Sequence, residues 1–208
     1  MSESSPQSRP EAEQAASQAV PALLADGSQP ASPSDLLRRL AELEIQSSTI
    51  MHAPVFTVEQ AKALRGEIQG AHIKNLFLRD KKGTMWLLTC LEDRPLDLKA
   101  LAGRIGSGRL SFGSAERLMK HLGVVPGAVT PFAVINDKGG AVQVLLDKAL
   151  LEIAPLNAHP LDNAMTTSLE PQDLVRFLEA EDHPPQLLEL DAPEDPPKDA
   201  PKDAVGDA

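Results

Sequence analysis

The chain has 208 residues, of which 42% are hydrophobic and 24% are charged, and its formal net charge is −10 at pH 7. This composition supports one hydrophobic core, and the lack of an 18-residue apolar run excludes a membrane-spanning helix. The first residues lack the basic flank and apolar segment of a secretory signal, so we expect a cytoplasmic protein without a membrane partner.

Both ends of the chain have the composition of solvated tails. Residues 1–32 hold four acids against one arginine in a background of Ser, Gln, Pro and Ala, and residues 191–208 hold six acids against two lysines in proline-charge repeats. Neither segment shows helical or strand periodicity. We therefore predict a disordered N-terminal tail over 1–32, one domain over 33–190 with a net charge of −3, and a disordered acidic Pro-rich tail over 191–208.

The first part of the domain contains two helix start signals. Ser32-Pro33-Ser34-Asp35 provides a hydroxyl cap, a proline at the first helical position and an acid near the positive end of the helix dipole. Thr57-Val58-Glu59-Gln60 is a second capping box, and it predicts a short helix that stops before Gly66. The segment between them, Met51–Phe56, reads as a strand or extended loop that carries His52.

The middle of the chain predicts two hairpins. Residues 71–79 and 84–91 are apolar runs on either side of Asp80-Lys81-Lys82-Gly83, and residues 132–136 and 141–146 repeat this pattern around Asp137-Lys138-Gly139-Gly140. Short helices are expected from about Leu98 to Ile105, from Ser114 to Gly123, and from Pro171 onward. Because hairpins dominate, the prediction is an α+β fold: a mixed, mainly antiparallel sheet with peripheral helices.

Cofactor motifs are missing from the sequence. There is no GxGxxG or Walker loop for a nucleotide, and the single cysteine, Cys90, has no metal-ligand cluster around it. Cys90 lies inside the apolar run 85–91, which favours a buried, unreactive thiol. We expect neither a cofactor nor a metal.

The loop Gly127–Pro131 permits two interpretations. Unpaired backbone N–H groups in such a loop can hold a carbonyl oxygen as it gains negative charge, which suggests ester chemistry without a side-chain nucleophile. Alternatively, glycine and proline only mark a turn. No Ser, His and Asp set is placed at a recognisable nucleophile elbow, so the expected attacking group is water.

A basic segment could bind a phosphate backbone. Residues 94–121 have a surplus of four positive charges, and the candidate RNA-binding residues within them are Arg104, Arg109, Arg117 and Lys120. An ordinary solvated helix face explains the same charges equally well. Few aromatic residues are available for stacking on bases, which argues against general single-strand binding.

Four segments in this order resemble the YbaK/prolyl-tRNA-synthetase-associated domain family, and more narrowly its freestanding alanyl-tRNA(Pro) deacylases. They are His52–Thr57, Lys74–Asp80, Gly127–Pro131 and His159–Asn163. The resemblance covers about residues 35–190. It implies hydrolysis of the ester that joins alanine to the 3′-terminal adenosine of tRNA(Pro), with prolyl-tRNA synthetase as a further candidate partner and no role for DNA.

The resemblance also implies roles for individual residues. The loop at Gly127 would stabilise the oxyanion, and Lys74 would hold the terminal phosphate or polar substrate atoms near it. His159 is a candidate general acid or base, or a ligand of ribose hydroxyls. The candidate substrate-binding residues are His52, Asn75, Thr130, Pro131 and Asn163. In the absence of the resemblance, Lys74 would be interpreted as a sheet-edge lysine. For His52, a structural histidine with satisfied hydrogen bonds is an almost equal alternative to a place in the pocket.

Two alternatives to this function remain at the level of the sequence. A YbaK-type domain would remove cysteine instead of alanine from tRNA(Pro), and the choice depends on pocket volume. A non-catalytic module that binds tRNA or a synthetase is the second alternative.

Overall fold

The computed structural model describes residues 23–52 and 68–190. Its centre is an eight-stranded sheet with the strand order β1-β7-β6-β2-β3-β5-β8, and β4 pairs with β2 beside this path. The strands are β1 (Ser47–Met51), β2 (Ala71–Arg79), β3 (Met85–Leu91), β4 (Ser111–Phe112), β5 (Val142–Asp147), β6 (Leu156–Ala158), β7 (Met165–Leu169) and β8 (Gln186–Leu188). The α-helices are α1 (Pro33–Glu42), α3 (Leu98–Arg104), α4 (Ala115–Leu122) and α5 (Pro171–Ala180), and the 3₁₀ helices are η1 (Pro131–Asn136) and η2 (Lys148–Glu152).

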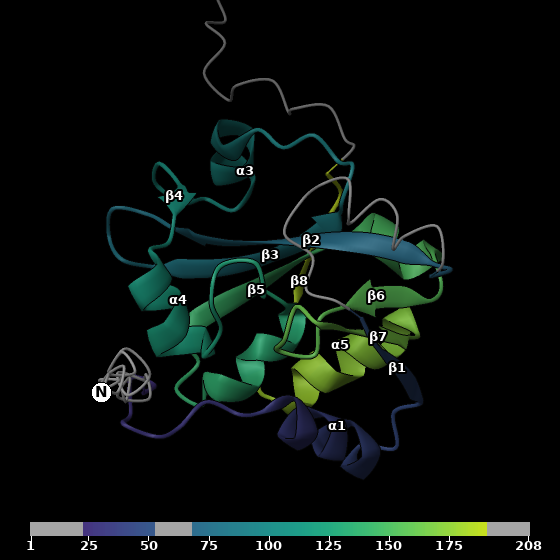
Figure 1. Cartoon of the computed structure of the whole chain (residues 1–208). Helices are drawn as coiled ribbons and strands as arrows, with labels where there is room; N and C mark the ends of the chain where they lie inside the picture. Colours follow the sequence, from purple (N-terminus) through teal and green to yellow (C-terminus); the bar gives the residue numbers. More distant parts are fainter. Residues whose placement is uncertain (1–22, 53–67, 191–208) are drawn as a thin grey trace, which may run out of the picture.

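Helices cover both faces of the sheet. In Figure 1, α3 and β4 lie above the long strands β2 and β3, whereas α1, α4 and α5 lie below them. Successive side chains of a strand point to opposite faces, so Phe77 of β2 packs into one apolar cluster and Leu78 packs into another. We call the cluster below the sheet, which contains Phe77, the main core, and the cluster around Leu78, Trp86 and Leu101 the second core.

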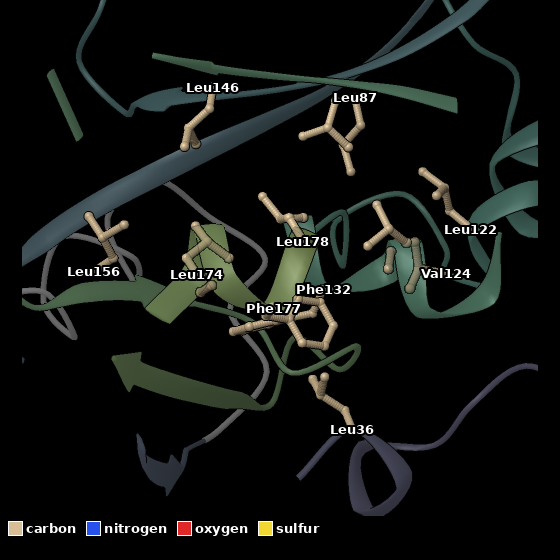
Figure 2. Packing of buried hydrophobic residues seen from close by; sticks show 14 of the residues in the cluster. Leu36, Leu87, Leu122, Val124, Phe132, Leu146, Leu156, Leu174, Phe177 and Leu178 are labelled. Carbon is tan, nitrogen blue, oxygen red and sulfur yellow. The ribbon is translucent and has the colours of Figure 1, made fainter. Parts of the chain in front are cut away.

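The main core joins α1, α4, α5 and η1 to the sheet. Phe132 of η1 and Phe177 of α5 meet edge to face with ring centroids 5.3 Å apart, and both are fully buried. Figure 2 shows Leu36 of α1 on one side of this pair and Leu178 of α5 on the other. Burial of the apolar residues of η1 therefore fixes the chain directly after the Gly127 loop.

The predicted helix boundaries are confirmed where the structure describes them. Ser32 caps α1 in a capping box with Asp35, and α4 begins after its cap Ser114 and ends at Gly123, which has a φ of 64°. Helices α3 and α5 also form where they were predicted, and α5 buries Leu174, Phe177 and Leu178. The predicted helix that opens at Thr57, and most of the extended segment 51–56, lie outside the described residues.

The first hairpin is confirmed and the second is wrong. Strands β2 and β3 pair antiparallel, and the Asp80 carboxylate in their turn accepts N–H groups of Lys82 at 2.9 Å and Thr84 at 3.1 Å. Residues 132–136 form η1 instead of a strand, because the Thr130 cap and Pro131 at the first turn favour a helix. Strand β5 pairs in parallel with β3 and β8 instead of with residues 132–136.

The fold class is as predicted. Antiparallel pairing joins β1 to β7, β2 to β3, β2 to β4 and β6 to β7, whereas β2–β6, β3–β5 and β5–β8 are parallel. The sheet is therefore mixed and mainly antiparallel, with helices at its periphery. Among the described residues, no helix has the length and apolar character needed to cross a membrane.

Residues 23–32, which were assigned to the N-terminal tail, pack on the domain. The Ala25 N–H donates to the Lys120 carbonyl at 2.8 Å, the Ala31 N–H donates to Asn136 Oδ1 at 2.8 Å, and Leu24 is buried. A tail boundary at residue 32 is thus too late. These ten residues before α1 were assigned to the tail because they lack helical or strand periodicity. Their backbone hydrogen bonds to the domain leave no periodic pattern in the sequence.

Candidate active site

The loop Gly127–Pro131 connects α4 to η1 and is held at both ends. Gly127 has a φ of 92°, a conformation that L side chains rarely adopt, and the Ala128 N–H donates to the Val125 carbonyl at 3.0 Å. At the other end, the fully buried Thr130 caps η1, its hydroxyl accepting the Phe132 N–H at 3.4 Å. Two anchors therefore define the path of the loop.

Three amide groups of this loop have no acceptor within the part of the chain that the structure describes. Within residues 23–52 and 68–190, no hydrogen bond uses the backbone N–H of Gly127, Val129 or Thr130. Backbone amides of this kind are the donors with which proteins stabilise a developing oxyanion. The loop can therefore supply the ester chemistry that its sequence suggests.

Strand β2 contacts this loop through Asn75. The Asn75 Nδ2 group donates to the Val129 carbonyl at 3.0 Å, and Asn75 shares the main-core face of β2 with Ile73 and Phe77. A side chain of the sheet thus fixes the backbone of the loop directly.

Two histidines lie together at the ends of β1 and β6. The rings of His52 and His159 have centroids 6.4 Å apart, and His52 Nε2 is 2.9 Å from the hydroxyl of buried Thr166. His159 Nδ1 donates to the Met165 carbonyl at 2.9 Å. Because a carbonyl oxygen only accepts, Nδ1 carries the proton and the neutral ring keeps Nε2 as an acceptor.

Asn163 connects the histidines to the loop. It lies on the turn between His159 and β7, and its Nδ2 is 3.8 Å from the position that a Cβ on Gly127 would occupy. The turn after β6 therefore approaches the open side of Gly127, and any side chain at position 127 would enter this space.

Comparison with known proteins identifies the family. A model of the aminoacyl-tRNA editing domain matches residues 52–177, more than half of the chain, and this range contains the loop, Asn75 and both histidines. The chain belongs to the aminoacyl-tRNA editing domain family. It is accordingly an aminoacyl-tRNA deacylase, an enzyme that hydrolyses the ester between an amino acid and tRNA.

Relatives match almost their whole length. The chain is 39% identical over 156 residues to the prolyl-tRNA editing protein ProX of Acetoanaerobium sticklandii, covering 74% of this chain and 95% of the relative. It is 40% identical over 161 residues to the prolyl-tRNA synthetase associated domain-containing protein 1 of Bos taurus, covering 75% and 94%. A solved structure described as a candidate trans-editing enzyme for prolyl-tRNA synthetase shares the fold, with a TM-score of 0.59 and 18% identity over 76% of this chain and 96% of that one.

Most of the site residues predicted for this editing domain come together. Gly127, Thr130 and Pro131 lie on the loop, Asn75 holds this loop through the Val129 carbonyl, and Asn163 lies beside Gly127. His52 and His159 form a second group, joined to the first by the turn that carries Asn163. Thr130 and Pro131 are buried, so their contribution is to shape the loop.

Lys74 lies on the other face of β2. It is partly buried on the side of Leu76 and Leu78, opposite Cys90 in β3, and its Nζ donates to the Arg94 carbonyl. The structure thus does not bring Lys74 to the loop that Asn75 contacts. Cys90 is buried as predicted, and burial raises the pKa of its thiol to about 11 even though Lys74 acts in the opposite direction.

The four candidate RNA-binding residues come from α3, the chain after it, and α4. Arg104 is on α3, above the sheet, where it donates to the Glu189 carbonyl and helps to line a hollow of about 400 Å³, and Arg109 follows in the exposed chain after α3. Arg117 and Lys120 are exposed on α4, whose apolar side packs into the main core below the sheet.

Two threonines of the site were not predicted. Thr166 contacts His52, and Thr89 donates to Asn75 Oδ1 at 2.7 Å. The signal for Thr89 was present: it is the one hydroxyl in the apolar run Met85–Leu91, and a hydroxyl in a buried strand requires a partner. The sequence did not show which partner.

Proposed function

We propose that this protein hydrolyses alanine from mischarged tRNA(Pro) as a freestanding editing enzyme. The observation that carries this proposal is the pair of loop amides at Gly127 and Val129, which belong to residues that are not buried, have no acceptor among the described residues and lie beside Asn75 and Asn163. Support for tRNA(Pro) comes from the relatives, which are named for prolyl-tRNA editing or for association with prolyl-tRNA synthetase.

The errors that a proline-specific synthetase makes favour a small amino acid as the one that this enzyme removes. A synthetase pocket shaped for proline discriminates poorly against alanine, because each missing methylene changes binding by only about 1 to 3 kcal/mol. A second site that is too small for proline corrects these errors. We place this activity in the cytoplasm, with prolyl-tRNA synthetase as the enzyme whose errors it corrects.

In the proposed reaction, water attacks the ester carbonyl carbon and the bond to the 3′ oxygen of the terminal adenosine breaks. The carbonyl oxygen becomes negatively charged in the tetrahedral intermediate, and the loop amides stabilise it. The leaving 3′ oxygen takes up a proton, and the products are alanine and free tRNA(Pro). His159 Nε2 is the acceptor that would bind a ribose hydroxyl or the attacking water.

The remaining predicted residues would bind the RNA end and the amino acid. His52 and Asn163 would border the amino acid. Lys74, on the other face of β2, would act outside the amino-acid pocket, where its ammonium group donates to the Arg94 carbonyl. Arg117 and Lys120 on α4, the helix that leads into the loop, are better placed than Arg104 and Arg109 to contact the acceptor stem.

A comparison of substrates tests the proposal. Initial rates of deacylation are measured for Ala-, Cys- and Pro-tRNA(Pro) at equal concentration, with spontaneous hydrolysis subtracted. The proposal predicts that kcat/KM for alanine exceeds that for cysteine by about tenfold, and that proline is left intact. Faster release of cysteine would assign the YbaK-type activity instead, and no release from any of the three would reject the proposed function.

A further inference from the structure

Thr89 occupies an unusual place in the sheet. It lies in β3 directly opposite Asn75 of β2, its side chain is fully buried, and its neighbours along the strand are apolar. Burial of a hydroxyl without a partner costs free energy, so a buried threonine here requires a specific hydrogen bond. Its partner is Asn75 Oδ1, at 2.7 Å.

The two hydrogen bonds of Asn75 determine its orientation. The Val129 carbonyl can only accept, so the Asn75 NH₂ group must face the loop, and the amide oxygen must then face β3. The hydroxyl of Thr89 is consequently the donor in its bond to Asn75. If this hydroxyl were absent, the Asn75 amide oxygen would lose its donor at the buried strand β3, a cost that favours displacement of the amide from the Val129 carbonyl.

The orientation of Asn75 in turn fixes a peptide plane of the loop. A trans peptide unit points its C=O and N–H in opposite directions, so the Thr130 N–H points away from Asn75 when the Val129 carbonyl points toward it. Thr130 is fully buried, so the plane acts on substrate through Val129, a partly exposed residue whose own N–H has no acceptor among the described residues. A flip of the Asn75 amide would place an oxygen against the Val129 carbonyl and displace this plane.

We propose that Thr89 is a positioning residue for the deacylase reaction, acting through Asn75 on the amides of the Gly127–Pro131 loop. This inference rests on the proposed function, because it assumes that these amides contact the ester oxygen. Thr89 itself touches no substrate. Its effect should therefore appear in the chemical step, with substrate binding almost unchanged.

The test is a pair of substitutions at one position. Thr89→Val keeps the shape and removes the hydroxyl, and kcat for Ala-tRNA(Pro) is expected to fall by about 10- to 100-fold with KM within about twofold. Thr89→Ser restores the donor and should recover kcat to within about threefold of the wild type. In an Asn75→Ala background, Thr89→Val should lower kcat by less than about twofold, because the residue through which it acts is gone.

Thr167→Val provides the matched control. Thr167 is also fully buried in the sheet, but its hydroxyl pairs with that of Thr49 at 2.8 Å, away from the loop. This variant should keep kcat. If Thr89→Val does not fold, Thr89→Ala replaces it, and the side-chain NH₂ of Asn75 in the wild type is examined by NMR for slow solvent exchange.

The outcomes separate the inference from the function on which it rests. A wild-type enzyme that deacylates no tRNA rejects the proposed function. An active wild type with an unchanged kcat in Thr89→Val, an equal loss in Thr89→Ser, or a rapidly exchanging Asn75 amide would overturn the role of Thr89.

Discussion

His183 is the residue whose surroundings determine its charge most clearly. Its Nδ1 lies 2.6 Å from the Glu181 carbonyl and its Nε2 lies 3.1 Å from Asp137 Oδ2, and both partners are acceptors. Both ring nitrogens must then donate, which requires the charged imidazolium. Burial acts to lower the pKa of His183, but the bonds to Asp137 and Glu181 outweigh it, and the pKa is raised above its ordinary value.

The two buried acids near His183 shift in the other direction. Burial acts to raise the pKa values of Asp137 and Glu181, but hydrogen bonds outweigh it and both values are lowered. The bonds come from His183 and two backbone N–H groups for Asp137, and from Lys138 and Arg39 for Glu181. A lowered carboxyl pKa stabilises the fold above the unfolded value, and this stability is lost as the pH falls through the folded value.

These shifts predict how stability depends on pH. A raised histidine pKa contributes stability below about pH 6.5 that is lost as the pH rises through the folded value, so stability should be greatest between about pH 4.5 and 6.5. In urea unfolding followed by Trp86 fluorescence, the wild type should lose stability from pH 6 to pH 8.5, and His183→Gln should lose less. His121→Gln is the control, since burial lowers the pKa of His121 and its removal should enlarge the loss. Equal losses in all three proteins would contradict this account.

At the same scale, the sequence indicated which candidate residues lie close together, but not which face of β2 each one occupies. His52, Asn75, Gly127, His159 and Asn163 come together as expected, whereas Lys74 and Asn75, adjacent in the chain, point to opposite sides of β2. A strand alternates its side chains, but only the burial of both faces by separate cores shows which face holds the loop. That information is absent from any local motif.

At the scale of elements, two glycines that end helices offer a matched comparison. Gly106 after α3 and Gly123 after α4 have nearly the same φ, 65° and 64°, so an alanine would be strained equally at either position. A Cβ on Gly106 would meet nothing within 4 Å, whereas one on Gly123 would lie 2.6 Å from Asn136 Nδ2 and 2.8 Å from Pro30 Cβ. The two positions differ only in the space around them.

Alanine substitution at the two glycines should therefore have unequal effects. Gly106→Ala should lower the free energy of unfolding by about 1 kcal/mol through backbone strain alone, and Gly123→Ala by about 2 to 4 kcal/mol because overpacking is added. Urea unfolding curves of the two variants and the wild type measure both losses. Similar values for the two variants would show that the contacts of Gly123 relax freely.

The helices and strands also show which features of the fold a local sequence pattern can predict. Caps and breakers act locally, so Ser32, Ser114 and Gly123 mark helix ends correctly. The run Phe132–Ile135 is apolar throughout, and periodicity cannot separate a buried strand from a buried helix in so short a segment. The parallel pairing of β5 with β3 joins residues about 57 positions apart, for example Trp86 and Gln143, and depends on the whole chain.

At the scale of the whole molecule, the site is assembled from four separated segments around one sheet. The ends of β1 and β6 bring His52 and His159, β2 brings Asn75, and the chain between α4 and η1 brings Gly127. Family resemblance supplied the list of residues, and the topology of the sheet explains why these segments meet. The central claim is that the loop amides hold the oxygen of the aminoacyl ester.

Amide chemical shifts test this claim most directly. The ¹⁵N-labelled protein is titrated with 3′-alanylamino-3′-deoxyadenosine, a stable amide analogue of the alanylated tRNA end, and the amides of Gly139 and Gly140 serve as a control turn. The account predicts saturable downfield shifts of the Gly127 and Val129 amides, with Gly139 and Gly140 unchanged. Shifts confined to residues around Lys74 and Cys90, with the Gly127 and Val129 amides unmoved, would contradict it.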